Sequence, residues 1–195
     1  MATFSELLDD VYTITNRPDL VAETKLAVKQ ATLKCHHSDY YPKDLVETGI
    51  QFTTPALLQS LEYRTLIPQW RSFKYLRKYI DGAPAGFFGI LTPEETLDRY
   101  AINRENVCYL AGEMLEIRSN TADSYLLLSA YIHPNISESA FSSWIALEHP
   151  YAIVYEAAAQ VFKTIGWDEQ SSAAKQNVVE QIVLLKQNQL QAQGY

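Results

Sequence analysis

Hydrophobic side chains near the N-terminus recur every three or four residues, which is the spacing of an amphipathic helix. This pattern predicts a first helix over residues 4–14, with Thr3 and Glu6 positioned as a capping box. A second, weaker pattern begins at Asp19, which is a residue type that caps helices, and fades near His37. The N-terminal part of the chain is therefore expected to form two helices.

The same spacing returns near the C-terminus. It predicts a helix that begins at Pro150, a tight turn at Gly166 and a further helix that begins at Asp168. Residues 187–195 then read Gln-Asn-Gln-Leu-Gln-Ala-Gln-Gly-Tyr and contain few apolar groups. We expect a rigid helical hairpin followed by a flexible polar tail that becomes ordered only on binding.

The middle of the chain alternates between apolar and polar residues with a period of two, and it is rich in aromatic residues. That pattern predicts antiparallel strands with one face open to water. The expected strands are residues 61–67, 73–79, 107–110, 114–118 and 125–132. Gly112 marks the turn of a hairpin, and Thr92-Pro93 predicts a short helix that ends near Tyr100.

Helices at both ends and strands between them predict an α+β fold, mainly α. The N-terminal and C-terminal helix pairs form a helical bundle, and an antiparallel β lobe is inserted between them. We expect a single domain over 1–195. Its helical core comprises 1–60 and 138–186, its β lobe 61–137, and its flexible C-terminal tail 187–195.

Composition and charge narrow the class of protein. With 47% hydrophobic and 20% charged residues, the chain has the composition of a soluble globular protein. Its formal charge of −7 argues against a broadly basic nucleic-acid surface. Residues 61–80 differ, because they contain Arg64, Arg71, Lys74, Arg77 and Lys78 but only one acidic residue. A basic lobe on an acidic body favours head-to-tail pairing in rings or stacked assemblies. Taken alone, the basic segment fits a solvated strand face better.

Two further features concern the cellular environment. No apolar run approaches the length of a membrane span, and the N-terminal residues lack the basic and apolar regions of a secretory signal. The two cysteines, Cys35 and Cys108, give no disulfide framework. We therefore expect a reducing compartment and no membrane partner.

Residues 35–39, Cys-His-His-Ser-Asp, contain the residue types that bind metal ions. Adjacent helical residues point about 100° apart, so they cannot all bind one ion. Histidine is also favoured at a helix C-terminus by the helix dipole. We expect this ordinary role, with no metal, no cofactor and no catalytic residue. An enzyme built around Cys35, His36 and His37 remains an alternative.

The segment 63–79 interleaves basic and aromatic side chains, a mixture that suits single-stranded nucleic acid. The same mixture suits any exposed sheet face on which Lys and Arg cover aromatic rings. A nucleic-acid-binding module is therefore the alternative function. Phe87 and Phe88 follow a turn at 81–86 and are either buried or presented to a partner.

The order of several short motifs resembles the head–tail adaptor proteins of tailed bacteriophages. Residues 64–71 are similar to the family's strand and Leu-x-Pro entry to the β lobe, and 108–117 resemble its hairpin with tyrosine, turn glycine and leucine. Residues 126–134 are similar to the next strand, which ends in Tyr-x-x-Pro, and 149–169 are similar to the helix pair around a glycine. The loop at 82–89 departs from the family pattern.

The resemblance implies a homo-oligomeric ring, usually a dodecamer, docked beneath the portal protein at the head–tail junction of the virion after assembly in the host cytoplasm. DNA would pass through its channel without specific binding. The C-terminal residues implied to bind the portal are Gln187, Gln189, Leu190, Gln191, Gln193 and Tyr195. The residues implied to contact a neighbouring subunit, the next ring or other tail proteins are Arg64, Arg71, Lys74, Arg77, Lys78, Phe87 and Phe88.

Overall fold

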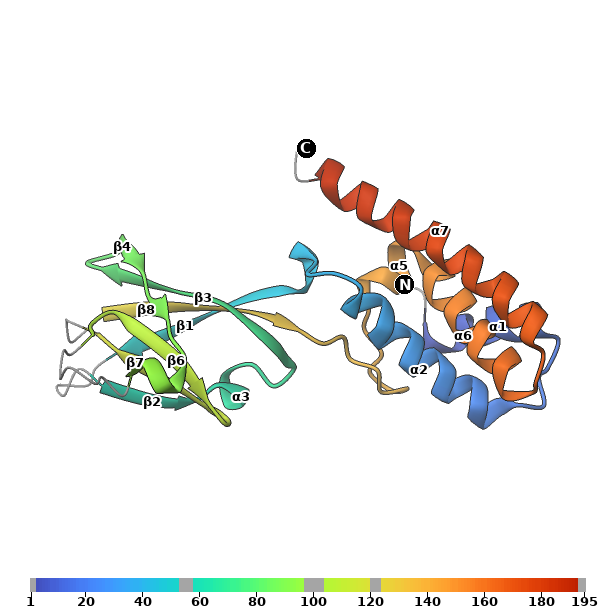
Figure 1. Cartoon of the computed structure of the whole chain (residues 1–195), viewed down its shortest axis with the longest axis horizontal. Helices are drawn as coiled ribbons and strands as arrows, with labels where there is room; N and C mark the ends of the chain where they lie inside the picture. The colour runs from blue at the N-terminus through green and yellow to red at the C-terminus, as the bar shows by residue number, and fades with distance from the viewer. Residues whose placement is uncertain (1–2, 53–57, 97–103, 120–123, 193–195) are drawn as a thin grey trace. The chain divides into compact units, whose positions relative to one another are not determined.

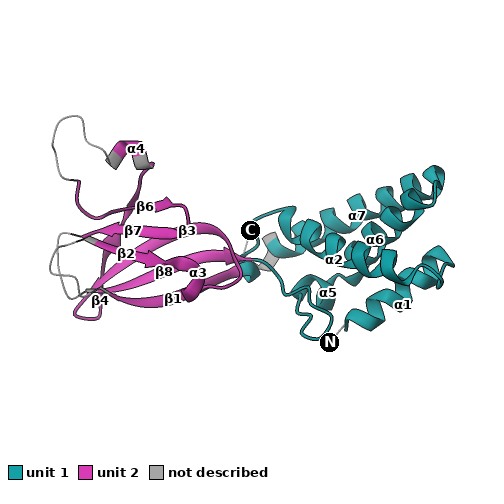
Figure 2. Ribbon diagram, turned by 90° about the horizontal axis from the view of Figure 1, so that it is seen from below, with its two compact units in different colours: residues 1–44, 133–195 teal, residues 45–132 magenta. Residues whose placement is uncertain are grey.

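The computed structural model describes residues 3–52, 58–96, 104–119 and 124–192, and the chain divides into two compact units. Unit 1 comprises Met1–Asp44 and His133–Tyr195 and is helical, whereas unit 2 comprises Leu45–Ile132 and is built mainly from strands (Figures 1 and 2). Both ends of the chain contribute helices to unit 1, and unit 2 is inserted between them. The predicted fold class, α+β and mainly α, is confirmed.

Two helix termini of unit 1 have the local chemistry that the sequence predicted. The Thr3 hydroxyl accepts the Glu6 N–H while the Glu6 carboxylate accepts the Thr3 N–H, which completes the predicted capping box. Gly166, at φ 78°, provides the left-handed turn between the last two helices. The helices are α1 (Phe4–Thr15), α2 (Val21–His37), the 3-10 turn η1 (Pro42–Asp44), α5 (Trp144–Glu148), α6 (Pro150–Thr164) and α7 (Asp168–Ala192).

Asp19 does not cap α2, contrary to the sequence prediction. The N-cap position is Leu20, which has no side-chain acceptor. The Asp19 carboxylate instead accepts two hydrogen bonds from the Arg17 guanidinium, at 2.8 and 2.7 Å. Both oxygens of the Asp19 carboxylate are thus directed at the Arg17 guanidinium, and α2 begins without a side-chain cap.

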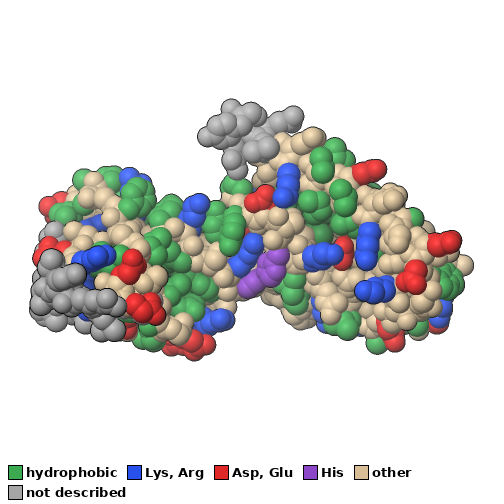
Figure 3. All heavy atoms as spheres, viewed as in Figure 1, with side chains coloured by type: hydrophobic (Ala, Val, Ile, Leu, Met, Phe, Trp, Pro, Cys, Tyr) green, Lys and Arg blue, Asp and Glu red, His purple; other side chains and the backbone are tan. Residues whose placement is uncertain are grey.

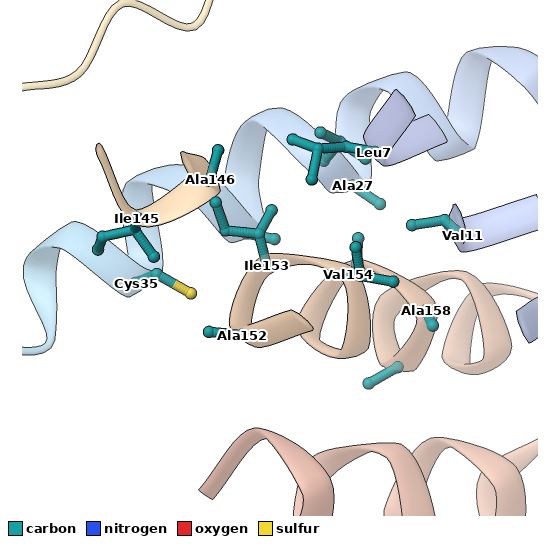
Figure 4. Packing of buried hydrophobic residues seen from close by; sticks show 14 of the residues in the cluster. Leu7, Val11, Ala27, Cys35, Ile145, Ala146, Ala152, Ile153, Val154 and Ala158 are labelled. Carbon is teal, nitrogen blue, oxygen red and sulfur yellow. The ribbon is translucent and has the colours of Figure 1, made fainter. Parts of the chain in front are cut away.

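Helix α6 is the centre of unit 1 and is buried along most of its length. Leu7 of α1, Ala27 of α2 and Ile145 of α5 gather on α6 in one apolar cluster (Figure 4). The run of alanines at 157–159 is fully buried, and small side chains there let neighbouring helices approach closely. Helix α7 packs along α6 as the second arm of the predicted hairpin. Both ends of the chain therefore share one core.

Two four-stranded sheets make up most of unit 2. One has the order β1-β8-β3-β4 and is antiparallel throughout; the other has the order β2-β7-β6-β5, in which β5 and β6 are parallel. The strands are β1 (Leu45–Phe52), β2 (Leu58–Glu62), β3 (Trp70–Ile80), β4 (Ala83–Phe87), β5 (Gly89–Ile90), β6 (Val107–Ala111), β7 (Met114–Arg118) and β8 (Ser124–Ile132). Two short helices, α3 (Tyr63–Leu66) and α4 (Pro93–Thr96), complete the unit.

A second apolar core lies between these sheets. Leu76 of β3, Leu115 of β7 and Leu128 of β8 are all fully buried in it. The hairpin of β6 and β7 turns at Gly112, at φ 62°, as the sequence predicted. The predicted strand at 125–132 is β8, which lies between β1 and β3.

The boundaries of the β lobe differ from the prediction. The lobe is Leu45–Ile132, whereas we expected 61–137, so β1 and β2 belong to it and not to the helical core. Residues 63–66 form helix α3, although the alternating pattern predicted a strand. The sequences of these segments are compatible with either a helix or a strand. Pairing of β1 with β8 and of β2 with β7 decides where the strands lie. The predicted helix from Thr92 is α4 at its start, and residues 97–103 lie outside the described residues.

The C-terminal segment also differs from the prediction. Helix α7 continues through Ala192, so residues 187–192 are helical and are not a flexible tail. Glutamine and leucine are good helix formers, and a helix that already exists extends at little cost. Polarity alone was therefore the wrong criterion for flexibility. Residues 193–195 of the expected tail lie outside the described residues.

Burial predicts which substitutions disrupt the bundle. Ile153→Ala removes a fully buried side chain from α6 and should lower the free energy of unfolding of unit 1 by about 2–5 kcal/mol. Val179→Ala on α7 is the matched control, because Val179 is 63% exposed, and should change it by less than about 0.5 kcal/mol. Urea titration of the helical circular dichroism signal measures both, and equal effects would contradict the assigned core.

Candidate docking surfaces

The outer face of the β1-β8-β3-β4 sheet is the most chemically distinctive surface of unit 2. Because side chains alternate along a strand, the buried residues Leu126, Leu128 and Ala130 place Tyr125, Leu127, Ser129 and Tyr131 on the opposite face. On that face Tyr125 is exposed, whereas Ser129 and Tyr131 are buried. The strand register then brings Tyr79 next to Tyr125 and Arg77 next to Leu127. Phe87 of β4 lies beside Arg77 on the other side.

Cations lie over aromatic rings on this face. The Arg77 guanidinium carbon is 5.3 Å from the centre of the Tyr79 ring and 5.4 Å from that of Phe87. The Lys74 ammonium nitrogen is 5.6 Å from the centre of the Tyr131 ring. The rings of Tyr75 and Phe87 meet edge to face at 5.4 Å. We call Lys74, Tyr75, Arg77, Tyr79, Phe87 and Tyr125 the cationic aromatic face.

Neighbouring strands fix the rings of this face. The Tyr75 hydroxyl donates to the Glu47 carboxylate of β1, and this hydrogen bond raises the pKa of Tyr75. The Tyr125 side chain extends over Gly49, where a Cβ atom would lie 2.0 Å from the Tyr125 hydroxyl oxygen. Glycine in β1 therefore makes room for the ring. Glu47, an acidic group beside the face, is already hydrogen-bonded to Tyr75.

The predicted contact residues of the β lobe do not form one surface. Lys74, Arg77 and Phe87 come together on the cationic aromatic face. Arg64 lies in α3, where its Nε is 3.7 Å from a Glu113 carboxylate oxygen. Arg71 is partly buried at an irregularity in the pairing of β3 with β8.

Two of the predicted contact residues are buried, and this corrects their assignment. Lys78 is adjacent to Arg77, so alternation turns it to the inner face of the sheet. Its ammonium lies 2.9 Å from the Ser119 hydroxyl oxygen and 3.3 Å from the Asn106 side-chain oxygen, and burial lowers its pKa. Phe88 is only 5% exposed and packs in the core, whereas Phe87 is 62% exposed.

The end of α7 is the second candidate surface. Gln187 and Asn188 are exposed, and the Asn188 amide nitrogen lies 3.5 Å from the His149 ring. Gln189 is buried. Of the remaining predicted portal-binding residues, Leu190 and Gln191 are in the last turn of α7. Gln193 and Tyr195 lie outside the described residues.

Helix α7 also exposes apolar side chains before its last turns. Val179, Val183 and Leu184 are each about half exposed or more. Hydrophobic side chains are visible over the part of unit 1 along which α7 runs, interspersed with charged ones (Figure 3). Such an outward apolar stripe on a long helix suits packing against another protein.

The Cys-His-His segment forms two separate hydrogen-bonded groups. His36 is buried; its Nδ1 lies 2.8 Å from Asp44 Oδ1 and its Nε2 lies 2.9 Å from the Ser143 hydroxyl oxygen. The Trp144 indole N–H also donates to Asp44, at 2.7 Å. His37 instead pairs with His133, at 3.1 Å between ring nitrogens.

This arrangement favours a structural role for the segment. Ser143 is the N-cap of α5 and accepts the Ala146 N–H, so its hydroxyl already has a local function. The network joins the end of α2, the turn η1 and the start of α5 at the point where the chain leaves unit 1. Within the described residues, no group of three or more His, Cys, Asp or Glu side chains could hold a metal ion.

Comparison with models of protein families gave no match to this chain, and comparison with curated proteins gave none either. None of the helices in the described ranges combines the length and the apolar character needed to cross a membrane.

The two thiols provide a test of burial at these sites. Burial raises the pKa of Cys35 and of Cys108 to about 12, so almost no thiolate exists in the folded chain at neutral pH. We expect a disulfide reagent to modify neither thiol in the native protein and both after unfolding. Rapid labelling of either thiol in the native protein would contradict their burial.

Because unfolded thiols ionise near pH 9 and folded ones do not, the free energy of unfolding should fall as pH rises from about 9 toward 12.

Proposed function

We propose that this chain is a head–tail adaptor of a tailed bacteriophage. In this role it is a structural virion protein that forms a ring, docks on the portal ring and joins the capsid to the tail. The motif order described above suggested the role, and the two-unit architecture supports it. The helical unit made by both chain ends would form the body of the ring, and the inserted β unit would present contacts to the next component.

Helix α7 is the observation that carries the proposal. It spans Asp168–Ala192, much longer than α6, against which it packs. Exposed amides at Gln187 and Asn188 lie near its end. Each amide both donates and accepts hydrogen bonds, so this end can satisfy polar groups lining a cleft in a partner. A long helix that packs on the core of unit 1 and ends in such groups suits insertion into a neighbouring ring.

The helical state of residues 187–192 changes how docking would occur. A disordered segment loses conformational entropy when it folds on its partner. A helix that already exists loses less, so the same contacts yield tighter binding. We therefore propose that the end of α7 docks as a preformed helix, with residues 193–195 beyond it.

The overall charge is compatible with a channel that DNA traverses. Phosphate groups bind basic surfaces and release counterions, whereas acidic surfaces repel them. Unit 1 contains thirteen acidic and eight basic residues and so has a formal charge of −5. A ring lined by unit 1 would let DNA slide without specific binding. The proposal assigns the chain a place at the head–tail junction, after assembly in the host cytoplasm, and a role without catalysis.

Truncation tests the role of α7. Deleting residues 187–195 should abolish docking on the cognate portal ring, observed by negative-stain electron microscopy of the mixture, because the amide-bearing end is removed. Since Gln189 is buried, a second variant that lacks only 190–195 keeps this residue. Thermal unfolding of both variants should resemble that of the intact chain. If the folded 187–195 deletion docked as well as the intact chain, the proposed role of α7 would be wrong.

A further inference from the structure

The cationic aromatic face of unit 2 presents large rings and two cations to solvent. Phe87 is 62% exposed and Tyr125 is 44% exposed. Lys74 is exposed and Arg77 is partly exposed, while the nearby Glu47 is hydrogen-bonded to Tyr75. Aromatic residues and arginine are the types enriched in protein interfaces, and a face of this kind favours an acidic partner surface.

Unit 1 supplies acidic groups in excess. Six of its eight basic residues form ion pairs with acids of the same unit: Arg17, Lys25, Lys29, Lys34, Lys43 and Lys186. These pairs use five acidic residues, Asp19, Asp39, Glu138, Glu148 and Glu156. The other eight acidic residues of unit 1 take no part in these six pairs, and they lie mainly on α1 and α7.

Helix α1 is the clearest of these. It contains Glu6, Asp9 and Asp10 and no lysine or arginine. All three acids are exposed, on the side of the helix opposite the buried Leu7 and Val11. Among the described residues, no ion pair includes Asp9 or Asp10. Aspartate is a poor helix former, and Glu6 and Asp10 are like charges four residues apart, so these acids lower the stability of the isolated helix.

We propose that the cationic aromatic face of one copy of the chain binds the acidic outer face of α1 in a second copy. The contact is head to tail, because two different surfaces meet. Contacts of this type generate rings when the rotation closes. The inference rests on the proposed ring-forming function and names the surfaces that would join its subunits.

Charge and burial contribute differently to this contact. The electrostatic attraction of Lys74 and Arg77 to Asp9 and Asp10 speeds the encounter of the two copies and fixes their register. This attraction weakens as salt screens it. Phe87 and Tyr125 supply apolar area that leaves water. The four charged positions are at the surface of their own units, so reversing them leaves both cores intact.

Charge reversal tests the pairing. The variants are Lys74→Glu with Arg77→Glu, and Asp9→Lys with Asp10→Lys, each compared with the intact chain by analytical ultracentrifugation without any portal protein. Each double variant places like charges at the contact and should weaken self-association on the order of tenfold or more. An equimolar mixture of the two should assemble, because every contact in an alternating assembly again joins opposite charges.

A matched control separates this contact from a change in total charge. Lys163→Glu with Lys175→Glu alters the net charge as much as the sheet-face variant does, at exposed positions of α6 and α7 outside the proposed contact. It should self-associate as the intact chain does. Circular dichroism and thermal unfolding establish that all variants are folded. Assembly of the mixture shows independently that both charge-reversal variants are folded.

The outcomes are distinct. An intact chain that stays monomeric at its highest soluble concentration, reversed variants that associate normally, or a mixture that fails to assemble would each overturn the inference. Binding of a single-stranded DNA oligonucleotide that is lost in the Lys74 and Arg77 variant would identify nucleic acid as the occupant and overturn it too. Portal docking is measured separately on the α7 truncations. The test of the adaptor role can therefore fail while the test of this contact succeeds, and the test of this contact can fail while that of the adaptor role succeeds.

Discussion

Antiparallel pairing of β1 with β8 is the constraint on which the rest of this fold depends. Their register places Leu45, the first residue of unit 2, opposite Tyr131, next to its last residue. The chain therefore enters and leaves the β unit at adjacent points. Because the entry and exit are close, helices from both ends of the chain can surround α6 in one core. On the helical side, His36 and Trp144 hold Asp44, the residue just before β1.

Alternation along the strands then decides which charged groups can meet a partner. Arg77 and Lys78 are neighbours in sequence, yet one lies between exposed aromatic rings and the other is buried beside Ser119. The basic character of the segment 61–80 is thus divided between a surface and an interior. The surface part is the portion available to a partner, and it is the part to which we assign binding of a second copy.

Helix α7 links the architecture to the adaptor role. It packs on α6, and Leu185 and Gln189 are buried in its C-terminal part. The end of the helix is consequently positioned by the core of unit 1 before any partner is present. In the assembly that we propose, the two contacts are independent, because the end of α7 faces the portal while α1 and the sheet face join subunits.

The sequence by itself determined the features that depend on neighbouring residues. The capping box at Thr3, the glycine turn at Gly166, the hairpin at Gly112 and the α+β class all follow from spacing and turn chemistry within a few positions. Only the tertiary structure decided the features that depend on distant partners. Strand β1 is defined by pairing with β8, far along the chain, and the burial of Lys78 and the His36 network require groups from separate segments. Local propensity carries no information about such contacts. The competing local conformations differ in free energy by less than the packing interactions that select between them.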